Sequence, residues 1–214
     1  SRGSMTVSRV RYYNQAMSGE ADETNTATIN IRAKAAGIID DVIFRGVDLY
    51  DTNSQAFTIS GVTGGVISNI IYQNGEIDSP SNQTSGGAWV PNIAIYNTTN
   101  ITIQDSIIHG AHAGALSTIL VGNDDGASTA RTVTNLTLIG NVIDQIPDTS
   151  TALNLINAAG ARVSGNSFRV ATGAGTTTGI KLTASYAMPV SGTAPGTTDA
   201  ALMGNLLQGL TTPI

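Results

Sequence analysis

The amino-acid sequence predicts an all-β solenoid of about six to seven coils, each built from three short strands. Three observations point to this fold class. A strand–turn–strand motif recurs along the chain, a further strand-like segment lies between successive copies, and the composition is typical of strands and turns. Among 214 residues there are 24 glycines and only 12% charged residues, and the chain is visibly rich in asparagine and threonine. Such residues favour turns and strands over helices.

The recurring motif consists of two short apolar strands on either side of a turn that contains glycine, asparagine or serine. The clearest copies are residues 100–108 and 135–143, which open with Asn-Ile-Thr-Ile and Asn-Leu-Thr-Leu. Other copies begin near residues 41, 69, 160 and 199, and a truncated copy begins at Met5. The starts are roughly 25 to 39 residues apart. Since the strands keep their length, the variation falls in the loops.

The third strand of each coil is the period-2 segment between motif copies. These segments are residues 29–31, 57–59, 93–95, 119–121, 153–155 and 180–182. One coil cannot bury its inward apolar side chains alone, whereas coils stacked about 4.8 Å apart form parallel sheets around a continuous core. A β-sandwich is the alternative, but the recurring motif and the lack of regular hairpin signals argue against it, since Asn74-Gly75 is the only Asn-Gly dipeptide.

The turn inside the motif is tight and favours a residue that tolerates the left-handed backbone conformation. We expect Asn141, Asn166 and Asn205 to occupy that position, with Asn74 one place earlier in its own copy. Stacked asparagine side chains at equivalent places in successive coils can hydrogen-bond to one another. The motif therefore predicts an asparagine ladder along the solenoid.

The composition excludes several classes of protein. With 10 Lys+Arg against 15 Asp+Glu, the net charge of −5 cannot neutralise a phosphate backbone, so no nucleic-acid partner is expected. No apolar run reaches 18 residues, so no membrane insertion is expected. The absence of cysteine excludes disulfides, thiol nucleophiles and thiolate metal sites.

The ends of the chain suggest how the domain is bounded. Residues 1–4, Ser-Arg-Gly-Ser before Met5, are typical of an expression scar, so the predicted β-helix domain is residues 5–214. Neither end carries a pattern typical of a solenoid cap, and an uncapped end exposes core and sheet edge. We therefore expect the domain to be a fragment of a longer protein, or its ends to be covered by partner subunits.

The motif copies at Asn100 and Asn135 resemble those of the right-handed, single-stranded parallel β-helix, or pectate-lyase-like, superfamily. This superfamily includes phage tailspikes, pectinases and alginate epimerases. The resemblance covers residues 5 to 207 and is strongest to a phage tailspike fragment. It implies a homotrimer on a virion or in another extracellular place that binds bacterial surface polysaccharide and depolymerises it as a hydrolase or lyase. Because one fold hosts many activities, the resemblance is far more specific for fold than for function.

Two alternative functions remain open. The first is a secreted polysaccharide lyase or epimerase, which would hold Ca²⁺ near Asp124, Asp125 and Asp148 and use a base such as Arg131 or Lys181. The second is a structural or adhesive solenoid without catalysis. No cofactor is expected, except Ca²⁺ if the protein is a lyase.

The candidate catalytic residues are acids in the loops. Enzymes of this superfamily carry their catalytic groups on one exposed strand ladder and its flanking loops, but the ladder around Ile93 presents no outward carboxylate. Glycoside hydrolysis needs two carboxyl groups about 5–10 Å apart. Loops are expected to supply Asp124, Asp125, Asp144, Asp148, Glu76 and Asp78. The catalytic candidates are Asp124, Asp125 and Asp148; the alternative is that they are solvated loop acids.

The carbohydrate-binding candidates are aromatic. Trp89 is the single tryptophan and lies in the long insertion of residues 79–92, and Tyr96 is expected to point outward a few residues later. Sugar rings stack on exposed aromatic faces, so Trp89, Tyr96 and Tyr72 are the predicted carbohydrate platform. The alternative is that Trp89 covers the solenoid flank or a subunit contact.

His109 and His112 form the only histidine pair. A His-x-x-His pair can chelate a metal or act as acid and base. With no third ligand indicated, two surface imidazoles are the alternative, and no metal site is predicted.

Overall fold

The chain folds as a parallel β-helix with three strands per coil, which confirms the predicted fold class. The computed structural model describes residues 5–8, 11–13, 29–33, 36–50, 55–61, 65–78, 84–85, 88–112, 115, 117–122, 131–183, 185–187, 193–212 and 214. Within these ranges all regular structure is β. No helix in this part of the chain is long and apolar enough to cross a membrane.

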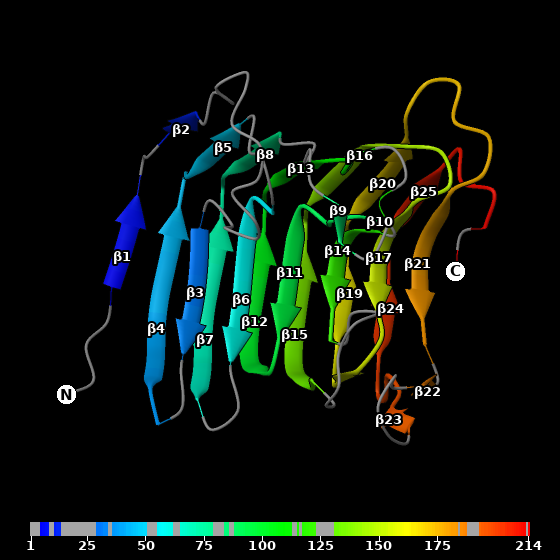
Figure 1. Ribbon diagram of the computed structural model, residues 1–214. Coiled ribbons are helices and arrows are strands. Elements are labelled where there is room, and N and C mark those ends of the chain that lie inside the picture. The colour runs from blue at the N-terminus through cyan, green and yellow to red at the C-terminus, as the bar shows by residue number, and fades with distance from the viewer. Residues whose placement is uncertain are drawn as a thin grey trace.

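Three parallel sheets form the walls of the solenoid (Figure 1). Sheet A contains β1 (Met5–Ser8), β4 (Ile38–Arg45), β7 (Val66–Gln73), β12 (Thr98–Gln104), β15 (Val133–Ile139), β18 (Ala158–Ala159), β19 (Arg162–Ser164) and β24 (Ala201–Met203). Sheet B contains β2 (Arg11–Tyr13), β5 (Asp48–Tyr50), β8 (Glu76–Asp78), β13 (Ile107–His109), β16 (Val142–Ile146), β20 (Ser167–Val170) and β25 (Leu206–Gln208). Sheet C contains β3 (Ile29–Ala33), β6 (Phe57–Gly61), β11 (Ile93–Tyr96), β14 (Ser117–Val121), β17 (Thr151–Leu155) and β21 (Thr178–Leu182).

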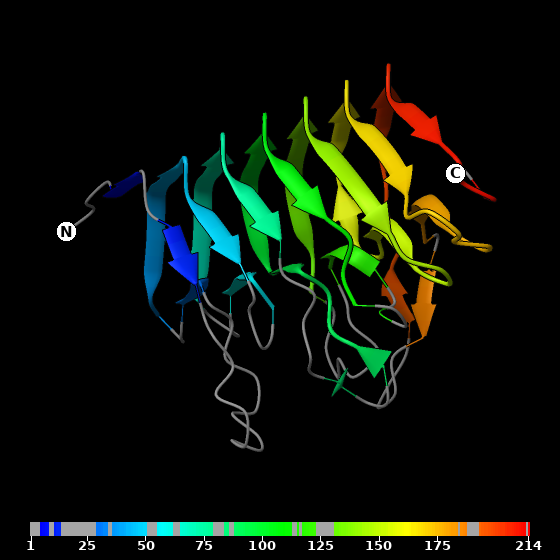
Figure 2. The same cartoon turned by 90° about the horizontal axis from the view of Figure 1, so that it is seen from above.

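The chain visits the sheets in the order A, B, C and then returns to A one coil further along. The two strands of the sequence motif thus lie in sheets A and B, and the segment between copies lies in sheet C. Figure 2 shows the coils as stacked rungs that run from the N-terminal to the C-terminal end of the solenoid. Two of the connections between sheets contain a small antiparallel hairpin. One hairpin pairs β9 (Thr84–Ser85) with β10 (Ala88–Trp89), between β8 and β11, and the other pairs β22 (Ser185–Ala187) with β23 (Thr193–Pro195), between β21 and β24.

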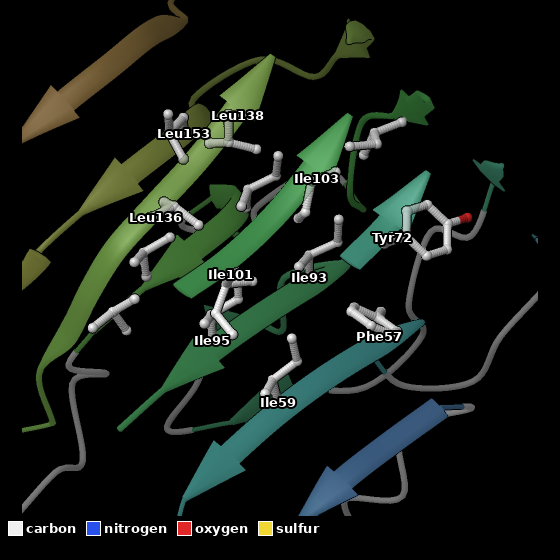
Figure 3. Close-up of a cluster of buried hydrophobic side chains, with 14 of the residues drawn as sticks. Phe57, Ile59, Tyr72, Ile93, Ile95, Ile101, Ile103, Leu136, Leu138 and Leu153 are labelled. Atoms are coloured by element: carbon white, nitrogen blue, oxygen red, sulfur yellow. The ribbon is translucent and has the colours of Figure 1, made fainter. Parts of the chain in front are cut away.

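A single core runs through the stacked coils. In sheet A, Ile70 pairs with Ile101 and Ile101 with Leu136, so like residues stack from coil to coil. In sheet C, Ile59, Ile95 and Val121 stack in the same way and are fully buried. Figure 3 shows the inward side chains of Ile59, Ile95, Ile101 and Leu136 meeting between the sheets. Phe57 and Tyr72 lie at one end of the cluster.

The turn between sheets A and B differs from the predicted one by a single residue. The left-handed conformation falls one place before the expected asparagines, at Gly46, Asn74, Asp105, Gly140, Gly165 and Gly204, with φ between 50° and 67°. The expected position was wrong for Asn141, Asn166 and Asn205 because a preceding glycine, which has no Cβ, accepts this conformation more readily. Their side chains nevertheless form the predicted ladder. Asn141 Nδ2 donates to Asn166 Oδ1 at 2.9 Å, and Asn166 Nδ2 to Asn205 Oδ1 at 3.0 Å.

A second ladder, which the sequence reasoning missed, lies on the outer surface of sheet A. The first residue of the motif adopts the left-handed conformation at Asp41, Asn69, Asn100 and Asn135, with φ of 55° to 57°. Asn100 Nδ2 donates to Asn69 Oδ1, and Asn135 Nδ2 donates to Asn100 Oδ1, each at 3.0 Å. Asparagine and aspartate tolerate this conformation better than other side chains do, which explains why they recur at the start of the motif.

Gly75, in the turn between β7 and β8, leaves room for the Tyr72 hydroxyl to reach the Val47 carbonyl. The Tyr72 hydroxyl donates to the Val47 carbonyl at 2.6 Å, directly beside the Gly75 backbone. A Cβ on Gly75 would overlap both the Val47 carbonyl oxygen and the Tyr72 hydroxyl. We expect Gly75→Ala to lower the free energy of unfolding by about 1–3 kcal/mol, the usual cost of overpacking a core, measured by urea denaturation. Gly175→Ala is the control, since its Cβ would lie 3.7 Å from the nearest atom; an equal loss in both variants would contradict this account.

Candidate functional site

The outer face of sheet C, where the sequence predicts the functional ladder, is covered at its middle coils, whereas outward residues of β3 and β21 are exposed. Ala94, Tyr96, Leu120 and Ile156 form a second apolar cluster there, separate from the core, with exposed fractions of 6% or less. The Arg131 guanidinium lies 5.1 Å from the centroid of the Tyr96 ring, within the range of a cation–π contact. None of the described strands of sheet C contains a carboxylate. These described strands therefore do not themselves supply the pair of acids that glycoside hydrolysis requires.

The three predicted carbohydrate-binding residues do not form an exposed platform among the described residues. Tyr72 is 1% exposed, because it occupies an inward position of β7 and packs against Phe57 at a centroid distance of 5.3 Å. Tyr96 is on the outer side of β11, as expected, but is only 6% exposed. The expected exposure of these two rings is therefore wrong. The backbone of Trp89 lies in β10, its side chain is outside the described part, and its role stays a prediction.

Of the three catalytic candidates, the structure describes only Asp148. Asp124 and Asp125 fall within residues 123–130, outside the described residues. Asp148 is exposed, and its carboxylate accepts hydrogen bonds from the backbone of Thr176 and Thr149. The bond from Thr176 is the main cause that holds the pKa of Asp148 below its ordinary value. A general acid needs a raised pKa, so this environment suits an ionised residue that ties two loops together.

The structure instead gathers polar residues on the outer face of sheet B. His109 in β13 lies between Glu76 in β8 and Asp144 in β16, on the coils before and after it. His109 Nε2 lies 3.0 Å from Glu76 Oε1, and His109 Nδ1 lies 2.6 Å from Asp144 Oδ1. The Tyr50 hydroxyl of β5 donates to Glu76 Oε2 at 2.7 Å. We call these four residues, which span four successive coils, the histidine cluster.

The expected loop positions of Glu76, Asp78 and Asp144 are wrong, since all three lie in strands of sheet B. The short strands of this sheet pair in register, so acids that are far apart in sequence become neighbours. His112, the other member of the predicted histidine pair, does not belong to the histidine cluster. Of the predicted pair, the structure places His109 between carboxylates.

Burial and hydrogen bonding act in opposite directions on His109. Burial, the largest single effect, lowers the pKa of the imidazole, but the hydrogen bonds to Glu76 and Asp144, together with the negative charges of Asp144 and Asp78, outweigh it and raise the pKa above its ordinary 6.5. The side chains are 14% exposed for His109, 34% for Glu76 and 24% for Asp144. The protonated imidazole donates from both nitrogens, so neither is left free to take a proton from a substrate.

A metal centre does not fit the histidine cluster. Glu76 and Asp144 contact opposite nitrogens of one ring, so a single ion cannot reach all three side chains. Elsewhere in the part of the chain that the structure covers, no group of three or more histidine, aspartate or glutamate residues is arranged to hold a metal ion. The cluster is therefore an ion-paired contact between coils.

The comparisons with known proteins support the fold. No protein-family model matches the sequence, and no curated protein matches it. The structure is similar to the crystal structure of PfbA, a surface adhesin of Streptococcus pneumoniae, with a TM-score of 0.59 and 13% sequence identity. The match covers 78% of this chain and 42% of the adhesin chain, so this chain corresponds to less than half of that protein. At this identity the likeness concerns the fold alone.

Proposed function

We propose that this solenoid is an adhesive domain outside the cell that binds a neutral bacterial surface polysaccharide without cleaving it. The observation that carries the proposal is the row of uncharged polar side chains on the outer face of sheet A. The amide face, as we name it, consists of Asn69, Asn100 and Asn135 together with Gln73 and Gln104. Its two hydrogen-bonded rows follow the solenoid axis across neighbouring coils.

The chemistry of the amide face suits sugar hydroxyls. Each amide offers two donors and an acceptor, and Thr102 and Thr137, paired in neighbouring coils, add hydroxyls between the rows. None of β7, β12 and β15 contains a charged residue. Asp40 and Arg45 of β4 lie at the N-terminal edge of the amide face, beside Asn69 and Gln73, so only the three strands β7, β12 and β15 are uncharged. An uncharged outer face on these strands favours a neutral ligand, and its repeat from coil to coil suits an extended polymer.

Two observations favour adhesion over cleavage. Sheet C carries no carboxylate in its described strands, and its middle coils are covered. The fold is similar to that of a protein named as a surface adhesin, which supports binding as the activity of such a solenoid. The tailspike-like homotrimer stays a prediction, and light scattering on the purified chain tests it.

Removal of an amide from the amide face is expected to weaken binding. Gln104→Ala loses hydrogen bonds worth about 0.5–1.5 kcal/mol each, so we expect glycan affinity to fall by about two- to tenfold. Binding is measured on an array of neutral bacterial polysaccharides and then by calorimetry with the best ligand. Gln208→Ala, which removes the same side chain from the outer face of β25 in sheet B, is the control and should bind as the unmodified chain does.

Other outcomes would redirect the proposal. If Trp89→Ala abolished binding while Gln104→Ala did not change it, the ligand would lie at the predicted aromatic site instead. Release of oligosaccharides from any bound polymer would overturn the non-catalytic function. In that case Asp124, Asp125 and Asp148 would be the first residues to substitute.

A further inference from the structure

We propose that His109 is a proton-operated clasp that holds three successive coils of sheet B together, and that loss of its proton loosens them. This inference goes beyond the proposed function and does not depend on it. It stands on the position of the imidazole, which is inserted between carboxylates of the preceding and the following coil at 3.0 Å and 2.6 Å. A side chain that contacts both neighbouring coils couples them directly.

The protonation state decides whether both contacts can exist together. A protonated imidazole donates one N–H to Glu76 and the other to Asp144. A neutral imidazole has a single N–H, so its second nitrogen would face a carboxylate, acceptor against acceptor. Loss of the proton therefore breaks one of the two links between coils and turns it into a repulsive contact.

The groups around the His109 ring all favour its protonated form. The titratable groups that face the ring are acidic, namely Glu76 and Asp78 from β8 and Asp144 from β16. Tyr50 of β5 extends the network by donating to Glu76. No described cation is among the groups that act on the ring, so the proton on His109 is the local positive charge that these acids share.

The clasp also reaches sheet C through the backbone of His109. The fully buried Asn92 donates from Nδ2 to the His109 carbonyl at 2.9 Å. The Asn92 carbonyl in turn accepts from the Phe57 amide at 3.1 Å, at the entry into sheet C. A shift of β13 therefore disturbs the corner where the chain passes from sheet B to β11. Loosening is expected at that corner as well as in β8, β13 and β16.

The direction of the pH effect follows from linkage. Because the pKa of His109 is raised in the folded coil, the stabilisation is complete below the ordinary value of 6.5 and is lost as the pH rises through the raised pKa. Each pH unit by which the clasp raises this pKa corresponds to a tenfold change in the local opening constant. The solenoid is therefore expected to be tightest here in mildly acidic solution.

Hydrogen exchange read by NMR tests the clasp in the intact chain. The amides of Ile107 and Val142, which bond to the Gly75 and Ser106 carbonyls at 3.0 Å and 2.9 Å, report on the junctions between the three coils. After correction for the intrinsic effect of pH, their opening constants should rise through the titration midpoint of His109, followed in the same sample by its ring resonances. The amide of Ile119 in sheet C, fully buried and away from this face, is the internal reference and should not change.

Three variants separate the clasp from other causes. In His109→Gln the pH-dependent rise should vanish, whereas in His112→Gln it should remain. Asp144→Asn keeps the imidazole but removes one carboxylate, so both the midpoint of His109 and the rise in opening should move to lower pH. Opening constants that stay flat through the His109 titration, or a rise that persists in His109→Gln, would overturn the proposal. If His109→Gln fails to fold, a rise that does not move in Asp144→Asn would overturn it equally.

Discussion

Asn141→Ala is expected to lower the free energy of unfolding by about 2–6 kcal/mol. Asn141 is 1% exposed and connects three coils. Its Oδ1 accepts from the Ser106 amide at 3.1 Å, and its Nδ2 donates to the Ile103 carbonyl at 2.9 Å. Alanine leaves both of these backbone groups buried without a partner, and each such group costs about 1–3 kcal/mol. The loss is measured by urea denaturation followed by far-UV circular dichroism.

The end of the same ladder supplies a matched control for Asn141→Ala. Asn205 makes equivalent bonds, with Nδ2 donating to the Val163 carbonyl at 2.9 Å and Oδ1 accepting from the Asn166 amide at 3.0 Å. It is only half-buried, so water can replace the missing partners after Asn205→Ala. We expect a clearly smaller loss there. Equal losses in the two variants would show that burial is not what makes the ladder stabilising.

Phe57→Ala is expected to cost about 3–5 kcal/mol, the usual range for removing a buried phenylalanine. The ring is fully buried and meets Phe44 edge-on and Tyr72 at a tilt, both at a centroid distance of 5.3 Å. Phe57 comes from sheet C, whereas Phe44 and Tyr72 come from sheet A. The Phe57 ring therefore fills the space between these two sheets. Thermal and urea unfolding measure the loss.

Phe57→Leu tests whether the cost comes from the cavity. Leucine keeps most of the apolar volume but removes the aromatic contacts, so we expect a smaller loss than for alanine. If leucine were as destabilising as alanine, the edge-on and tilted ring contacts would outweigh the volume that the side chain fills.

The repeat made most of the fold predictable from the sequence. Motif copies such as those at Asn100 and Asn135 fall in neighbouring strands of sheet A, with Ile101 opposite Leu136. Aligning the motif copies predicts the register between neighbouring strands, because like residues stack on one another in a parallel solenoid. The exact turn residue did not follow, since Gly140 and Asn141 are both compatible with a tight turn and only the three-dimensional path decides which one adopts the left-handed conformation.

The candidate site was less predictable because it depends on which residues each loop brings back into register. Tyr72 was expected outside, but the alternation at the end of β7, from Ile70 to Gln73, places Ile71 outward and Tyr72 inward. The contact between His109 and Asp144 had a signal in the sequence, since each follows the second strand's paired isoleucines, Ile108 and Ile143, by one residue. What the sequence could not give is the conformation of the long loops, and the residues expected to act there include Asp124 and Asp125.

The nearest-neighbour stacking of the coils has a mechanical consequence. β1 and β25 lie at opposite ends of the solenoid, and the hydrogen bonds between coils run along its axis (Figure 1). Tension applied between the two ends acts first on the outermost rungs, because each coil is held only by the coils beside it. Under load such a chain would lengthen in steps, one coil at a time. Each released residue would add about 3.3–3.6 Å, so the chain would lengthen by unwinding its end coils while the central coils stayed folded.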